Sequence, residues 1–150
     1  MESARAPSLE AIIGELHAAT TANRTTLRLD APGEDFPVVV ESLAPGMRPI
    51  AGDVSFGIRS AGTVRYLESE QKVLVQRDIL GVEPAPAPEL VERYGARAQM
   101  LAPLIREGRL IGIVSVHHAG GIRDFTSDEV AALEQAVDLI LTELPASEAS

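Results

Sequence analysis

Two runs rich in branched apolar side chains lie near the C-terminus, at residues 97–105 and 110–118, and only Arg106-Glu-Gly-Arg109 separates them. Such runs favour β-strands. Gly108 can adopt the positive φ that a tight hairpin turn requires. The pair therefore predicts a β-hairpin, which needs neighbouring strands and a cover over its apolar face to be stable.

A helix with a clear start follows this hairpin. After Gly120 and Gly121, Thr126 and Glu129 have the spacing of a capping box, in which each side chain accepts a hydrogen bond from the other residue's backbone amide. One apolar stripe then follows: Val130, Leu133, Val137, Ile140, Leu141 and Leu144. Helical spacing of apolar residues also predicts an amphipathic helix over residues 8–20.

The segment after the first helix has the pattern of a second hairpin. Residues 24–30 alternate between polar and apolar, as a half-buried strand does, and residues 31–35 have turn chemistry. Residues 36–43 form the returning apolar run. We expect an antiparallel pair of strands here.

The middle of the chain is less regular. Proline and glycine interrupt residues 44–53, a short helix is predicted within residues 60–69, and a short apolar run follows at 73–75. Alternate prolines in residues 83–88 predict an extended surface loop, or a mobile lid, before a short helix at 88–94. The order helix, hairpin, irregular crossover, hairpin, helix predicts an α+β domain whose terminal helices cover one sheet face and whose crossover covers the other.

Composition excludes several classes of function. The chain has 150 residues, the size of one domain, and no cysteine, which excludes disulfides, thiolate metal sites and cysteine nucleophiles. The net charge of −9 disfavours nucleic acid as a partner. No run of apolar residues is long enough to span a membrane, and the acidic, proline-containing start is not a signal peptide. We expect one cytoplasmic domain over residues 1–150, with a core at 8–144 and a flexible tail at 145–150.

Residues 99–116, followed by Phe125-Thr126 at the start of the last helix, resemble the end of a GAF domain, in which a strand closing on Pro-Leu turns through a glycine into an Ile-Gly strand. Residues 73–78 are similar to the short strand ending in Asp that precedes the family's variable crossover. The resemblance extends over residues 8–144. It implies a GAF/PAS-like antiparallel sheet of five or six strands, a ligand cavity between sheet and crossover, and a homodimer formed through the terminal helices.

GAF domains serve as sensors of cyclic nucleotides, chromophores, haem, amino acids and anions, and the fold alone does not choose among these ligands. Three options are excluded by absent residues. The chain lacks the asparagine-lysine-phenylalanine-aspartate-glutamate signature of cyclic-nucleotide members, the cysteine that bilin-binding members commonly use, and the cysteines of the family's methionine sulfoxide reductases.

Strand alternation divides residues 110–118 between two faces. One face receives Ile111, Ile113, Ser115 and His117, and the other receives Leu110, Val114, Val116 and His118. In the partner strand, Arg97 and Gln99 share one parity. A single face therefore carries Arg97, Gln99, Ser115 and His117 toward the implied pocket, where they suit a ligand with a carboxylate, amide or similar oxygen-rich group. In the alternative interpretation Arg97 faces solvent beside an acid and His117 is a satisfied residue at a strand end.

The crossover contributes four further ligand-binding candidates to the roof of this pocket: Arg65, Tyr66, Gln76 and Tyr94. Asp78 is interpreted as a turn-stabilising residue, since aspartate side chains readily bind nearby backbone amides. His117 and His118 are strand neighbours that point to opposite faces and cannot easily share a metal ion, so no metal or cofactor is predicted.

Two functions remain. The first is a small-molecule sensor that acts in trans on a partner or output protein. The second is a degenerate domain without ligand that serves dimerisation or protein interaction, with Ile140, Leu141 and Leu144 at the contact. No nucleophile elbow, phosphate loop or zinc-protease motif is present, so no enzyme is predicted. A weaker third option is an enzyme that uses His117 as a general base.

Overall fold

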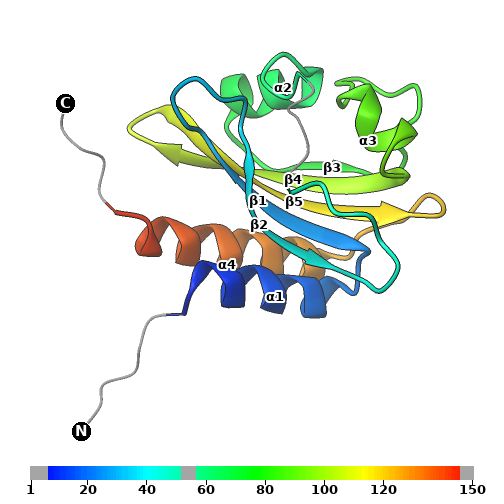
Figure 1. The fold of residues 1–150 in the computed structure, drawn as a ribbon, viewed down its shortest axis with the longest axis horizontal. Coiled ribbons are helices and arrows are strands. Elements are labelled where there is room, and N and C mark those ends of the chain that lie inside the picture. The colour runs from blue at the N-terminus through cyan, green and yellow to red at the C-terminus, as the bar shows by residue number, and fades with distance from the viewer. Residues whose placement is uncertain (1–6, 52–56, 146–150) are drawn as a thin grey trace, which may run out of the picture.

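The computed structural model describes residues 7–51 and 57–145, which form a five-stranded antiparallel sheet between two helical layers (Figure 1). The strands are β1 Arg24–Leu29, β2 Val38–Leu43, β3 Leu74–Gln76, β4 Ala96–Arg106 and β5 Arg109–Ala119, in the order β2-β1-β5-β4-β3. Every pair is antiparallel. The predicted α+β class is thereby confirmed, with both predicted hairpins present.

Helices α1 Leu9–Thr20 and α4 Ser127–Glu143 lie side by side on one face of the sheet (Figure 1). Their apolar stripes and the facing strand residues form the larger core, in which Ile13, Leu133 and Ile140 are fully buried. Ser8 caps α1 by accepting a hydrogen bond from the amide of Ala11. The terminal-helix layer is therefore where the sequence places it, because both helices have a marked apolar stripe.

The capping box of α4 is present and is expected to stabilise the domain. The Thr126 hydroxyl accepts from the Glu129 amide at 3.1 Å, and the Glu129 carboxylate accepts from the Thr126 amide at 2.9 Å. We expect Thr126→Ala to lower the free energy of unfolding by about 1 kcal/mol, since a backbone amide loses its partner. Urea denaturation measures this loss. Ser127→Ala, at the exposed next position, is the control and should change stability by less than about 0.5 kcal/mol.

The other sheet face is covered by the crossover layer, which contains α2 Gly62–Glu70 and α3 Pro88–Glu92 (Figure 1). The proline-rich loop between β3 and α3 packs against the start of α2: the Thr63 amide donates to the Ala85 carbonyl at 3.0 Å. A Cβ on Gly62 would lie 3.0 Å from the Ala85 nitrogen. The predicted surface loop is thus bound to its neighbours and half-buried.

The predicted start of the second strand was wrong. Phe36 is not the first residue of β2, because it adopts a left-handed conformation with φ 49°. Its side chain turns into the second core, beneath the Arg59 guanidinium at 4.6 Å.

The alternation in β5 was wrong at its first two residues. Leu104 pairs with Gly112 but Ile105 pairs with Leu110, so Ile111 is an extra residue in a bulge. Leu110 therefore joins Ile113 under the crossover, and Ile111 packs against the terminal-helix core. A bulge moves the following side chains to the opposite face of the strand, and this sequence contains no pattern that predicts it.

Of the predicted flexible tail at 145–150, residues 146–150 lie outside the described residues. Within residues 7–51 and 57–145, no helix combines the length and apolarity needed to cross a membrane.

Candidate functional site

Polar side chains cross the sheet in a row beneath the crossover layer. In the strand register Gln76 of β3 lies opposite Gln99 of β4, Gln99 opposite His117 of β5, and His117 opposite Arg24 of β1. Each of the four is at least nine-tenths buried. Buried polar groups are costly unless hydrogen-bonded, so the partners of this row decide what it can do.

Three side chains of the row form a hydrogen-bond chain that ends on the crossover loop. The Gln76 amide nitrogen donates to the Pro84 carbonyl at 2.8 Å, and the Gln99 amide nitrogen donates to the Gln76 carbonyl oxygen at 2.7 Å. His117 Nε2 lies 3.1 Å from the Gln99 carbonyl oxygen. The chain links the sheet centre to the crossover.

His117 is neutral, and one of its ring nitrogens has no partner. Burial lowers the pKa of His117 to about 3, and the positive charges of Arg24 and Arg28 act in the same direction. Its Nδ1 is buried and has no hydrogen-bond partner among residues 7–51 and 57–145. The hydroxyl of Thr26, which lies opposite Ser115 on the neighbouring strand β1, is also buried and has no hydrogen-bond partner among these residues.

The lowered pKa of His117 makes the domain sensitive to acid. The unfolded chain binds a proton near pH 6.5 while the folded chain does not until about pH 3, so stability is complete above about pH 6.5 and falls as the pH decreases through this window. Between about pH 7 and pH 5, wild type should lose about 2 kcal/mol more than His117→Gln. Urea denaturation at a series of pH values measures this difference, and parallel curves would contradict it.

A small, partly open cavity adjoins His117, between β1, β4, β5 and the crossover. Its volume is about 20 Å³, which is room for about one water molecule. The polar residues that line it are Arg28, Thr63, Ser115 and His117. The apolar residues that line it are Ile58, Ala61, Val64, Ala87, Leu90, Leu101 and Ile113. An apolar cavity with a few polar groups is the usual form of a small-molecule site.

Two buried arginines flank this region. The Arg24 guanidinium donates to the Glu41 carboxylate at 2.7 Å and to the Arg48 carbonyl at 2.7 Å, and it lies 5.2 Å from the centre of the Tyr94 ring. Arg28 donates to the Phe36 carbonyl at 2.8 Å. Burial lowers the pKa of Arg28 to about 10, so it stays cationic at neutral pH.

Four of the predicted site residues come together: Gln76, Gln99, Ser115 and His117. Ser115 and His117 line the cavity. Gln99 is hydrogen-bonded to the His117 ring, and Gln76 is hydrogen-bonded to Gln99. Tyr94 is buried nearby but packs in a separate cluster, under Arg24.

Three predicted residues lie elsewhere. Arg97 is the extra residue of a bulge between Ala96 and Ala98, so its side chain leaves the polar row and pairs with Asp78 at 3.3 Å near the surface. Arg65 is exposed on the outside of α2, and Tyr66 packs at the margin of the second core. Asp78 stabilises its turn as predicted, by accepting from the Leu80 amide.

Sequence reasoning missed the contribution of β1, whose residues Arg24, Thr26 and Arg28 face the crossover. The alternation of these polar residues with Thr25, Leu27 and Leu29 was visible, but a polar strand face is ordinarily exposed to solvent. Across residues 7–51 and 57–145, no group of three or more His, Asp or Glu residues is placed to hold a metal ion.

The five-stranded sheet, the paired terminal helices and the cavity under a crossover define a class of small α+β domain. A family model for the GAF domain matches residues 6–144, and the chain therefore belongs to the GAF domain family. No curated protein sequence matches the chain.

Several solved structures with this fold are domains of photoreceptors. The chromophore-binding domain of Stigmatella aurantiaca phytochrome P1 has a TM-score of 0.74 at 18% identity, covering 92% of this chain and 53% of that one. A phycocyanobilin-bound GAF domain from a cyanobacterial phytochrome has a TM-score of 0.72 at 21% identity, covering 91% and 84%. The Thermosynechococcus elongatus PixJ GAF domain has a TM-score of 0.68 at 17% identity, covering 87% and 77%. At these identities the likeness concerns the fold.

Proposed function

We propose that this GAF domain is a cytoplasmic small-molecule sensor that acts in trans on a partner or output protein. The observation that carries the proposal is the buried Nδ1 of His117, which has no hydrogen-bond partner within residues 7–51 and 57–145 and belongs to a residue that lines a cavity. An unsatisfied buried acceptor costs about 1–3 kcal/mol, and a ligand that binds there recovers part of that cost. Solved neighbours that bind a bilin provide a precedent for ligand binding in this fold.

The ligand we propose is compact and carries an oxygen-rich group such as an amide or carboxylate. A cavity of about 20 Å³ is far smaller than a tetrapyrrole requires. The chain also has no cysteine to attach a chromophore. A ligand of several atoms must displace the crossover layer outward, and this displacement is the conformational signal.

Native mass spectrometry of the gently purified protein, followed by a thermal-shift screen of small amides, carboxylates and amino acids, tests the sensor function. A ligand that binds only the folded state raises the melting temperature. Ala61→Leu, which fills the cavity, should abolish this shift, whereas Arg65→Ala, on the exposed side of α2, the helix that Ala61 precedes, should retain it. A shift that survives Ala61→Leu would place the ligand elsewhere.

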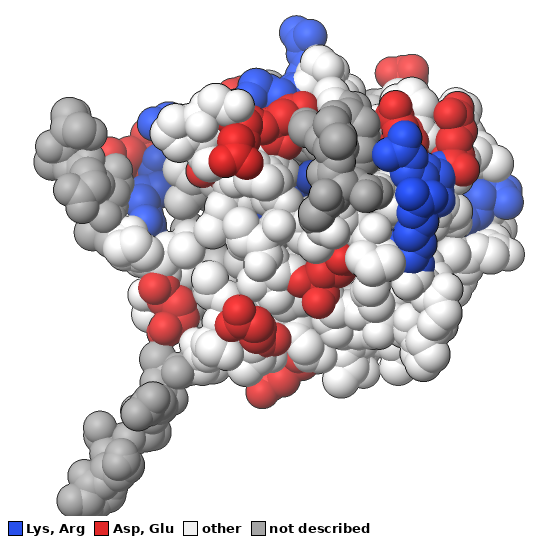
Figure 2. Space-filling view, viewed as in Figure 1, with Lys and Arg blue, Asp and Glu red and all other residues white. Residues whose placement is uncertain are grey.

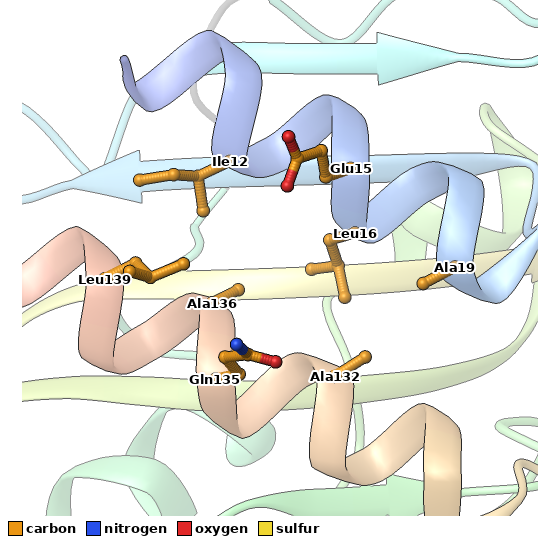
Figure 3. A pocket seen from close by; sticks show the side chains of 8 residues that line it. All are labelled: Ile12, Glu15, Leu16, Ala19, Ala132, Gln135, Ala136 and Leu139. Carbon is orange, nitrogen blue, oxygen red and sulfur yellow. The ribbon is translucent and has the colours of Figure 1, made fainter. Parts of the chain in front are cut away.

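A second function, dimerisation through the terminal helices, is favoured by a groove of about 170 Å³ between α1 and α4 (Figure 3). Small and apolar side chains line most of it: Ile12, Leu16, Ala19, Ala132, Ala136 and Leu139, with Glu15 and Gln135 at its margin. The contact predicted at Ile140 is wrong, because this side chain is fully buried within the domain.

The negative charge of the two helices opposes such a dimer at low salt. Helices α1 and α4 contain acidic residues and no Lys or Arg, and the charged side chains visible on their part of the surface are acidic (Figure 2). We therefore expect association to increase with salt, which screens the repulsion. Sedimentation of Leu139→Glu tests the groove, and Leu141→Glu tests the contact predicted at the end of α4; dimerisation of Leu139→Glu as strong as that of wild type would exclude the groove.

A further inference from the structure

We infer that the cavity selects neutral ligands that present a hydrogen-bond donor, an amide N–H or a hydroxyl, to Nδ1 of His117. This inference rests on the proposed sensor function, since it names the chemistry of the ligand at the same site. It narrows the oxygen-rich ligands proposed above to amides and alcohols, which have a donor, and excludes carboxylates, ketones and esters, which do not.

The direction of the hydrogen-bond chain fixes which ring nitrogen carries the proton. The Pro84 carbonyl can only accept, so the group of Gln76 that bonds to it must be the amide nitrogen. The carbonyl oxygen of Gln76 then faces Gln99 and requires the amide nitrogen of Gln99. The carbonyl oxygen of Gln99 in turn requires a proton on Nε2 of His117.

The other nitrogen is therefore a bare acceptor. A neutral imidazole carries one proton, and with that proton on Nε2 the Nδ1 of His117 presents a lone pair. This atom is buried and has no partner in the described parts of the chain, 7–51 and 57–145. Because Nε2 is occupied by Gln99, Nδ1 is the ring nitrogen left to an occupant of the cavity that His117 lines.

A ligand that has only acceptors cannot easily reverse this arrangement. Moving the proton to Nδ1 would set the Nε2 lone pair against the Gln99 oxygen, and turning both amides to relieve this would set the Gln76 oxygen against the Pro84 carbonyl. Adding a second proton is opposed by burial, which lowers the pKa of the ring to about 3. Gln76 and Gln99 therefore act as positioning residues for His117.

Nearby charge disfavours ammonium donors, although Glu41 pairs with Arg24 and offsets part of its charge. The guanidinium groups of Arg24 and Arg28 are close enough to His117 to lower its pKa, and Arg28 also lines the cavity. A cationic ligand would meet this positive potential in a poorly screened interior. A neutral amide satisfies both requirements, because its N–H faces Nδ1 and its carbonyl oxygen suits the positive side of the cavity.

The state of the ring is measured first, by ¹⁵N NMR of the histidine side chains in the wild-type protein. We expect His117 to have a protonated Nε2 and an unprotonated Nδ1 throughout the neutral pH range. A proton on Nδ1, or a doubly protonated ring at neutral pH, would overturn the inference. The measurement needs no ligand, so it is independent of the proposed function.

Selectivity is measured with acetamide and acetone, which have the same number of heavy atoms and differ in the donor. We expect acetamide to shift the Nδ1 resonance and to bind at least about ten-fold more tightly than acetone, a difference of about 1.4 kcal/mol. Equal affinities would overturn the donor requirement and leave the sensor function intact. If neither probe binds, the sensor function and the inference both fail.

The role of the hydrogen-bond chain is tested with Gln76→Met, which removes the link to Pro84 and frees Gln99 to turn. The ratio of acetamide to acetone affinity should fall toward one, and the second tautomer should become populated. Gln71→Met, which removes a hydrogen bond from an exposed glutamine amide to the Gly108 carbonyl, is the matched control and should keep the wild-type ratio. An unchanged ratio in Gln76→Met would show that the chain does not position the ring. If Gln76→Met does not fold, the two wild-type measurements still decide the inference.

Discussion

Replacing Glu41 with Ala is expected to lower the free energy of unfolding by about 3–5 kcal/mol, as is typical when one partner of a buried ion pair is removed. The side chains of Arg24 and Glu41 are 1% and 6% exposed, and the two charged groups are 2.7 Å apart. Glu41 also accepts a hydrogen bond from the Ile50 amide at 2.9 Å. The substitution leaves a buried guanidinium without its counter-charge beneath the crossover, so the effect should be the largest of any change discussed for this domain.

Chemical denaturation measures this loss of stability, and two further variants serve as a control and as a test of its cause. Glu134→Ala removes an exposed carboxylate from α4 and should change stability by less than about 0.5 kcal/mol. The double variant Arg24→Met, Glu41→Leu should recover part of the loss, because no buried charge is left unpaired. A loss below about 1 kcal/mol for Glu41→Ala would show that water reaches Arg24.

Gly112→Ala is expected to cost about 3 kcal/mol, because the centre of the sheet has no room for a Cβ. A Cβ at this position would lie 2.6 Å from the Arg28 carbonyl oxygen and 2.7 Å from Leu104 Cδ1. The backbone of β1 cannot move without disturbing Arg28 at the cavity. The same substitution should therefore also weaken any ligand binding there.

Gly14→Ala is the control, and it should raise the free energy of unfolding. Nothing lies within 4 Å of a Cβ on Gly14, which is in the interior of α1, and alanine favours a helix over glycine by about 1 kcal/mol. Denaturation curves of both variants test the pair of predictions. Equal changes in the free energy of unfolding for the two variants would show that the lack of room for a Cβ is not what requires glycine at position 112.

Part of the candidate site could be predicted from the sequence. Alternation correctly grouped Gln99, Ser115 and His117, because β4 and β5 are regular where these residues pair. It failed for Arg97, where a bulge begins, and for Ile111, where another reverses the parity. Bulges arise from the fit of a strand to its neighbours and have no signature in these residues.

The cavity itself could not be derived from the sequence, because it depends on contacts between distant segments. The alternating polar residues of β1 become buried only because α2, α3 and the proline-rich loop cover them. The proton on His117 is likewise decided by a chain that runs through β4 and β3 to Pro84.

The sequence by itself determined the elements: the hairpin around Gly108, the capping box at Thr126, the amphipathic terminal helices and the order that makes the domain α+β. These features depend on neighbours within a few residues, where capping, turn geometry and periodicity act. Only the tertiary structure decided which polar face is covered, which ring nitrogen of His117 is left without a partner and which charges surround it. These properties follow from burial and from hydrogen bonds between strands, which local sequence does not specify.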